Sequence, residues 1–179
     1  MLNSRPNNER YKQGNYLPIN KDKVIKLNDE RGVYYRSSWE YKVMFWLDTN
    51  ESILRWGAEC LIIPYQSNDI VNGELVLREH CYYPDFYYEL KIGDKVRCVV
   101  AEVKPYKEYK MVQTLLDIKD GKINESDIKI PDGGKKLKNF EYDLKTAQKN
   151  LSKWETIIRW CDIKGYEFKI ITELNLKNN

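Results

Sequence analysis

The sequence predicts an α/β domain in which a β-sheet is flanked by helices. Three features predict it: an amphipathic helix precedes the strands, two strand-like runs meet at a tight turn, and a long amphipathic helix leads into a last strand. A chain of 179 residues is the size of one domain and can bury a core. Its 13% aromatic content argues against disorder for most of the chain.

Residues 1–32 are predicted to form an extended basic N-terminal arm. The stretch is polar, rich in Asn, Lys and Arg, and has no regular hydrophobic period. We expect it to order on a partner, with a solvated tail as the equal alternative. The single folded domain then spans residues 33–179.

The first helix is expected over residues 37–48, with Ser37 as its N-cap. Its apolar side chains recur at helical spacing and predict one buried stripe. They are Trp39, Val43, Trp46 and Leu47. Short strand-like runs follow over residues 53–56 and 60–65, and then a polar turn over residues 68–73.

A β-hairpin is expected over residues 80–104. An aromatic run, 82–88, and a β-branched run, 96–103, flank Gly93 and Asp94, and a glycine in first position suits a two-residue hairpin turn. A short helix over residues 108–118 and a loop ending near Lys136 come next.

The last helix is expected over residues 139–164, with Gly165 ending it and a strand over 166–172 following. Its apolar seam alternates by three and four residues. The seam comprises Phe140, Leu144, Ala147, Leu151, Trp154, Ile158 and Cys161. Trp154 is interpreted as a core residue.

Two carboxylates are predicted to meet across the hairpin. With Gly93 and Asp94 in the turn, counting outward places Asp85 opposite Glu102, with Cβ atoms about 4.5–5.5 Å apart. Carboxylates this close repel unless a proton or a cation intervenes, and hard oxygen ligands suit Mg²⁺. Lys104 shares the face of Glu102 because alternate strand residues point the same way. The alternative for Asp85, Glu102 or Lys104, each taken by itself, is an ordinary solvated residue of a strand.

The composition excludes several other functions. The single histidine, His80, which we interpret as structural, cannot supply a two-histidine protease site, and no GxSxG accompanies it for a serine triad. The cysteines form no CxxC pair, which disfavours zinc fingers, and we expect reduced thiols. The net charge of +3 indicates a polyanionic partner only weakly. No apolar run is long enough to span a membrane.

The hairpin motifs carry a family resemblance. Tyr83-Pro84-Asp85-Phe86 and Ala101-Glu102-Val103-Lys104-Pro105 resemble the signature of the PD-(D/E)xK nuclease superfamily. The resemblance implies a restriction-endonuclease-like core, with a central mixed β-sheet flanked by helices. It also implies a catalytic glutamate on the preceding helix, here Glu40. The alternative for Glu40 is a capping box with Ser37.

A narrower resemblance rests on the order of short motifs between Tyr35 and Glu173. They are Tyr35-Arg36-Ser37-Ser38-Trp39-Glu40, Phe45-Trp46-Leu47-Asp48, Ile62-Ile63-Pro64-Tyr65, the two hairpin motifs, and Lys153-Trp154-Glu155. This order is similar to the head-completion nucleases of tailed bacteriophages, whose catalytic core is TnsA-like. The resemblance implies a Mg²⁺-dependent DNA endonuclease of phage head completion and DNA packaging. It would act in the host cytoplasm during assembly or in the virion, with DNA and portal or head proteins as partners.

The resemblance also assigns roles. Asp85, Glu102 and the backbone carbonyl of Val103 would hold Mg²⁺, for which Mn²⁺ can substitute. Glu40 would reach the metal through water or hold a second ion, and Lys104 would orient the attacking water. Weaker candidates for DNA contact are Lys135, Lys136, Lys138, Gln148, Lys149 and Lys153. For the lysines of the last helix, an ordinary solvated helix face is the equal alternative. Two other functions stay open: an inactive structural protein that binds the portal, and a repair or junction-resolving nuclease.

Overall fold

The core of the protein is a four-stranded mixed sheet. The computed structural model describes residues 12–26, 30–71 and 74–176. The strand order is β3 (Ile53–Ala58), β6 (Phe86–Ile92), β7 (Lys95–Val103) and β8 (Glu167–Ile171). β7 and β8 run parallel, whereas the other neighbours are antiparallel. The predicted fold class, a central mixed sheet flanked by helices, is therefore confirmed.

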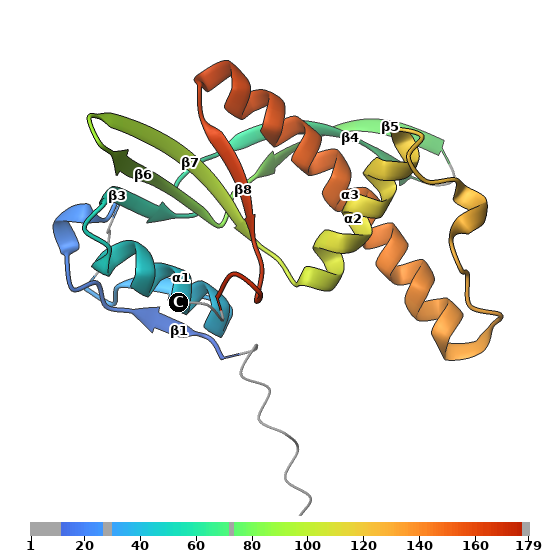
Figure 1. Ribbon diagram of the computed structural model, residues 1–179, viewed down its shortest axis with the longest axis horizontal. Coiled ribbons are helices and arrows are strands. Elements are labelled where there is room, and N and C mark those ends of the chain that lie inside the picture. The colour runs from blue at the N-terminus through green and yellow to red at the C-terminus, as the bar shows by residue number, and fades with distance from the viewer. Residues whose placement is uncertain (1–11, 27–29, 72–73, 177–179) are drawn as a thin grey trace, which may run out of the picture.

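Helices cover both faces of this sheet (Figure 1). α1 (Ser38–Thr49) packs on one face, where Met44, Leu47 and Trp56 are fully buried. α3 (Gly134–Lys164) and α2 (Tyr106–Lys119) cover the other. None of the helices in the described ranges is long and apolar enough to cross a membrane.

Smaller elements surround this core. β4 (Ile63–Val71) and β5 (Glu74–Tyr82) form a separate hairpin that runs beside α3 in Figure 1. β1 (Gly14–Tyr16) pairs with β2 (Val33–Tyr35). Two single 3₁₀ turns are η2 (Lys21–Lys23) and η3 (Glu125–Asp127).

The predicted hairpin register is confirmed. Ile92 pairs with Lys95, and the ladder continues in step to Phe86 opposite Ala101. Gly93 has φ +59, the left-handed value that a glycine-first turn requires. Asp85, one residue before β6, therefore lies level with Glu102.

Two strand predictions were wrong in their limits. Residues 82–88 do not form one strand, because Tyr82 ends β5 and Asp85 precedes β6. The turn predicted at residues 68–73 lies largely within β4, which extends to Val71. Pro84 lies between the two strands and has no N–H group to donate to a strand ladder. The aromatic residues around it are all strand-prone, so composition alone does not reveal the break.

The last helix starts earlier than predicted. α3 begins at Gly134, so Lys135, Lys136 and Lys138 lie on its first turns and not in a loop. Its buried stripe includes Asn150 and Ile157, whereas Ile158 is 44% exposed and was wrongly placed in the seam. The stripe is centred toward Asn150 and Cys161, which turns Ile158 to solvent.

Residues 12–26, predicted to belong to the arm, instead pack on the domain. Tyr16 is buried, and its hydroxyl donates to Asp48 Oδ2 at 2.7 Å. Ile25 N donates to Trp56 O, which extends the sheet beyond β3. Residues 1–11 and 27–29 lie outside the described part of the chain, so the arm remains a prediction for them.

Asp48→Ala should destabilise the fold by about 3 kcal/mol or more, because it removes the acceptor of several buried or half-buried donors. The fully buried Asp48 carboxylate accepts from the Tyr16 hydroxyl, from Ile19 N at 2.7 Å and from Asn20 N at 3.0 Å. Urea unfolding measures the loss. The exposed Asp132→Ala should change little, and equal midpoints for the two variants would contradict this account.

Candidate active site

The two predicted carboxylates lie together where β6 begins and β7 ends. Asp85 Oδ2 accepts a hydrogen bond from Val103 N at 2.7 Å, and its backbone carbonyl accepts from Glu59 N at 3.1 Å. Lys104 N donates to Ile171 O of β8 at 2.9 Å. The segment that carries Glu102 is thus fixed by neighbours on both sides.

Glu102 is 4% exposed and has a partner for each oxygen. Lys104 Nζ lies 2.8 Å from Oε1, and the buried Tyr82 hydroxyl donates to Oε2. The sequence places Tyr82 in the aromatic run of the predicted hairpin and gives it no role at the site. Its role depends on the pairing of β5 with β4, which brings the end of β5 to the carboxylates and which no local sequence signal predicts.

The electrostatics are those of a like-charge pair with one counter-charge. Burial first, and then the negative charge of Glu102, raise the pKa of Asp85 to about 7, although Lys104 and the Val103 N–H act to lower it. Burial alone would lower the pKa of Lys104, but the two carboxylates outweigh burial and raise it. The amine is therefore an ammonium, and the site holds one cation against two carboxyl groups.

Glu40 forms the capping interaction that was the alternative to catalysis. Ser37 Oγ accepts from Glu40 N at 3.2 Å and donates to Oε1 at 2.9 Å, while Arg36 N donates to Oε2 at 2.8 Å. Glu40 is nevertheless close enough for its charge to raise the pKa of Asp85. The N-terminus of α1 therefore borders the site.

A second lysine reaches the site from α3. Lys153 Nζ lies 5.6 Å from the centre of the Tyr82 ring and 6.0 Å from that of Tyr65. Burial lowers the pKa of its amine, and Lys149 one turn earlier lowers it further. Lys153 makes no salt bridge within the described residues, so a half-buried cation faces the same space as the carboxylates.

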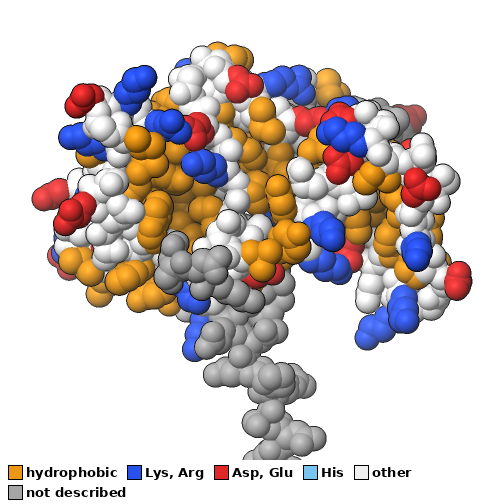
Figure 2. Space-filling view, in the orientation of Figure 1, with side chains coloured by type: hydrophobic (Ala, Val, Ile, Leu, Met, Phe, Trp, Pro, Cys, Tyr) orange, Lys and Arg blue, Asp and Glu red, His pale blue; other side chains and the backbone are white. Residues whose placement is uncertain are grey.

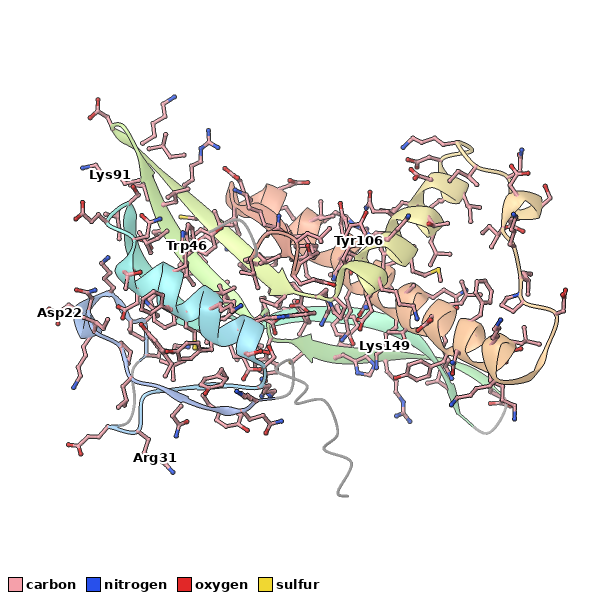
Figure 3. The ribbon with its side chains drawn as sticks, turned by 60° about the horizontal axis from the view of Figure 1, so that its bottom comes forward. Asp22, Arg31, Trp46, Lys91, Tyr106 and Lys149 are labelled. Carbon is pink, nitrogen blue, oxygen red and sulfur yellow. The ribbon has the colours of Figure 1, made fainter. Side chains whose placement is uncertain are left out.

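The other predicted DNA contacts lie along α3. Gln148 and Lys149 are exposed, and Figure 3 shows Lys149 where α3 passes the β4–β5 hairpin. Lys135, Lys136 and Lys138 are also exposed but begin the helix. At 1.5 Å per residue they lie about 25 Å from Lys153. The structure brings Lys153 to the site, with Lys149 one turn before it, and leaves the first three lysines distant from it.

Comparison with known proteins now identifies the family. The family described as TnsA-like endonuclease N terminal matches residues 50–173, which is more than half of the chain. The chain belongs to the TnsA-like endonuclease family. The matched range contains Asp85, Glu102, Lys104 and Lys153, whereas Glu40 lies before it.

The chain is also similar to a phage protein. It is 27% identical over 164 residues to the head completion nuclease of Enterobacteria phage T4, an alignment that covers 92% of this chain and 93% of the phage protein. No solved structure matches significantly.

The donor set of the site fits a hydrated Mg²⁺ better than a metal enclosed by side chains. In the ranges that the structure describes, no three His, Cys, Asp or Glu side chains are grouped closely enough to hold an ion. Two neighbouring carboxylates and a backbone carbonyl are the kind of partial oxygen set that Mg²⁺ accepts, since it keeps several waters. The Lys104 ammonium is one cation beside the two carboxyl groups of Asp85 and Glu102, so a bound metal ion would offset the remaining negative charge.

Proposed function

We propose that this chain is a Mg²⁺-dependent DNA endonuclease that acts in phage head completion. The observation that carries the proposal is the half-buried Asp85 level with the buried Glu102, with the ammonium of Lys104 2.8 Å from Glu102 Oε1. The assignment to head completion is supported by the similarity to the T4 protein along nearly the whole length of both chains.

Asp85, Glu102 and the Val103 carbonyl are the groups that would hold the metal, with Glu40 acting through water. When bound, Mg²⁺ polarises a phosphate oxygen and lowers the pKa of a bound water. Asp85 and Glu102 are held by Val103 N and by Tyr82, so their positions are set before the metal arrives. The Lys104 ammonium would orient the attacking water and offset negative charge that develops on the phosphate.

The DNA backbone would pass along α3. Lys153 would bind a phosphate next to the scissile one, because its half-buried amine has no carboxylate partner in the described residues. Lys149 and Gln148 would extend this contact, and Lys135, Lys136 and Lys138 would reach phosphates further along the duplex. Such contacts are sequence-blind and weaken with salt.

An inactive structural head-completion protein is the second candidate. Such a protein would also be similar to the T4 protein, but it would not require the carboxylate pair. A buried pair of like charges opposes folding, so a scaffold that never binds a cation gains nothing from it. A repair or junction-resolving activity is the remaining alternative, which the substrate used in the assay would distinguish.

Plasmid cleavage tests the proposed function. We expect wild-type protein with Mg²⁺ to nick or cut supercoiled plasmid, and EDTA to stop it. Glu102→Gln, which keeps the shape of the side chain, should lower the rate about a thousandfold, while Glu141→Gln on the exposed face of α3 should leave it unchanged. Absence of cleavage of any DNA form would favour the structural protein, and cleavage of branched DNA alone would favour junction resolution.

Tyr82→Phe should weaken metal binding by about tenfold or more while the affinity for DNA stays the same. The lost hydroxyl is the donor that holds Glu102 Oε2, and such supporting bonds commonly contribute a factor of this size. Calorimetric titration with Mn²⁺ measures metal affinity, and fluorescence anisotropy of a labelled duplex in EDTA measures DNA affinity. Tyr142→Phe, at an exposed position, serves as the control. Unchanged Mn²⁺ affinity would reduce Tyr82 to a packing role.

A further inference from the structure

A groove of about 780 Å³ lies between α1 and β8, on the sheet face opposite to Tyr82 and Glu102. Its floor and walls are mostly apolar and include Trp46, Tyr88 and Ile171. Phe45, which also lines the groove, is 48% exposed. Figure 2 shows hydrophobic side chains gathered on this face, and Figure 3 shows Trp46 between α1 and the sheet.

The groove lies beside an open sheet edge. At the other edge of the sheet, Val24 of the same chain lies beside β3 and forms a bridge to Trp56. Ile25 N donates to Trp56 O there at 2.7 Å. β8 pairs with β7, and no other strand of the described residues pairs with it. An unpaired edge strand next to an apolar groove is the arrangement to which an extended peptide adds as a further strand.

The charged residues that line the groove determine which ligand charge it favours. The charged residues that line the groove are Lys42 and Lys169, and no Asp or Glu lines it. Lys169 Nζ lies 3.4 Å from Glu167 Oε2, with both side chains more than a third exposed. An exposed pair of this kind is weak, so the Lys169 ammonium can exchange Glu167 for an acidic group on a ligand.

We propose that β8 and this groove bind an extended segment of a partner protein that carries both acidic and apolar side chains. The segment adds as a strand to the free edge of β8. Lys169 and Ile171 point to the same face because they are two residues apart in the strand. The ligand therefore places an acidic side chain opposite Lys169 and an apolar one opposite Ile171, where cross-strand pairs interact most strongly.

Two other occupants fit less well. A second copy of this chain that paired through β8 in antiparallel fashion around Lys169 would place two lysines opposite each other, which is unfavourable. The chain's own residues 1–11 contain Arg5 and Arg10 against a single Glu9, the wrong sign for a groove lined by lysines.

A designed peptide tests the proposal with the full-length protein. In this fluorescein-labelled probe, glutamate and phenylalanine alternate along one face of the strand and threonine fills the other. A second peptide carries lysine in place of glutamate, and a third is the acidic peptide with alternate backbone amides methylated. Anisotropy titrations use wild-type protein, the double variant Lys42→Glu/Lys169→Glu, and the matched control Lys110→Glu/Lys129→Glu, which changes net charge equally at exposed positions.

We expect the acidic peptide to bind the wild type, and the groove double variant to bind it about tenfold more weakly and to prefer the basic peptide. The control variant and the wild type should differ by much less, and amide methylation should abolish binding. Equal or absent binding of the acidic and basic peptides would overturn the proposal. So would displacement of the peptide by a short DNA duplex in EDTA, or a dimer in solution that the groove variant alone dissociates.

Discussion

Asp85→Asn should abolish DNA cleavage and yet raise the stability of the metal-free protein at pH 8. The carboxylate is half-buried beside the buried Glu102, and the loss of solvation together with the Glu102 charge raises its pKa to about 7. The folded protein therefore holds this proton more tightly than the unfolded chain does. Stability falls as the pH rises from about 4 to about 7, and above pH 7 the folded state carries the full cost of the ionised pair.

Asparagine removes that cost and keeps the acceptor for Val103 N. The gain should be on the order of a few kcal/mol, or roughly 2–4 °C in Tm for each kcal/mol in a chain of this size. Activity should fall about a thousandfold or more because a metal ligand is lost. Thermal unfolding in EDTA at pH 5 and pH 8 measures the first effect, and plasmid cleavage the second.

Adding Mg²⁺ allows the thermal stability of the wild type and of Asp85→Asn to be compared with and without the metal. It should raise the Tm of the wild type at pH 8, because it binds the folded state only, and should leave that of Asp85→Asn nearly unchanged. The exposed Asp132→Asn should behave as the wild type does in both assays. An Asp85→Asn variant that unfolds below the wild type at pH 8 in EDTA would refute the like-charge interpretation of the pair.

The hairpin that carries the site was predictable because its register follows from local rules. A two-residue turn at Gly93 and Asp94 leaves one pairing, and that pairing brings Asp85 level with Glu102. The limits of α1 were equally accessible, since Ser37 caps the helix through its own side chain. In both cases residues close in sequence determine the structure.

Features that depend on distant contacts were not predictable in the same way. The Tyr82 hydroxyl reaches Glu102 because β5 pairs with β4, and Tyr16 is buried because it donates to Asp48. Neither residue lies in a hydrophobic pattern that distinguishes it from other tyrosines in this Tyr-rich chain. Lys153 was one of several lysines on a predicted helix face, and only the position of α3 over the rings of Tyr65 and Tyr82 separates it from the rest.

Lys104→Gln should also abolish cleavage, but with the opposite effect on stability. The ammonium is the counter-charge nearest to the pair, 2.8 Å from Glu102 Oε1, and its side chain is 24% exposed. Its loss leaves two carboxyl groups without compensation and should destabilise the metal-free protein at pH 8 by roughly 3 kcal/mol. The pKa of Asp85, which Lys104 lowers, should rise further, so Mn²⁺ binding should require a higher pH than in the wild type.

The double variant Asp85→Asn/Lys104→Gln distinguishes this electrostatic account from simple damage to the fold. If the lysine stabilises the protein by offsetting an excess of negative charge, its removal should cost much less once Asp85 is neutral. The two stability changes should then be strongly non-additive, as expected for groups in contact. Urea unfolding of the wild type, both single variants and the double variant in EDTA at pH 8 provides the cycle. Additive changes would mean that Lys104 stabilises the fold through packing, and that its charge is not coupled to the carboxylate pair.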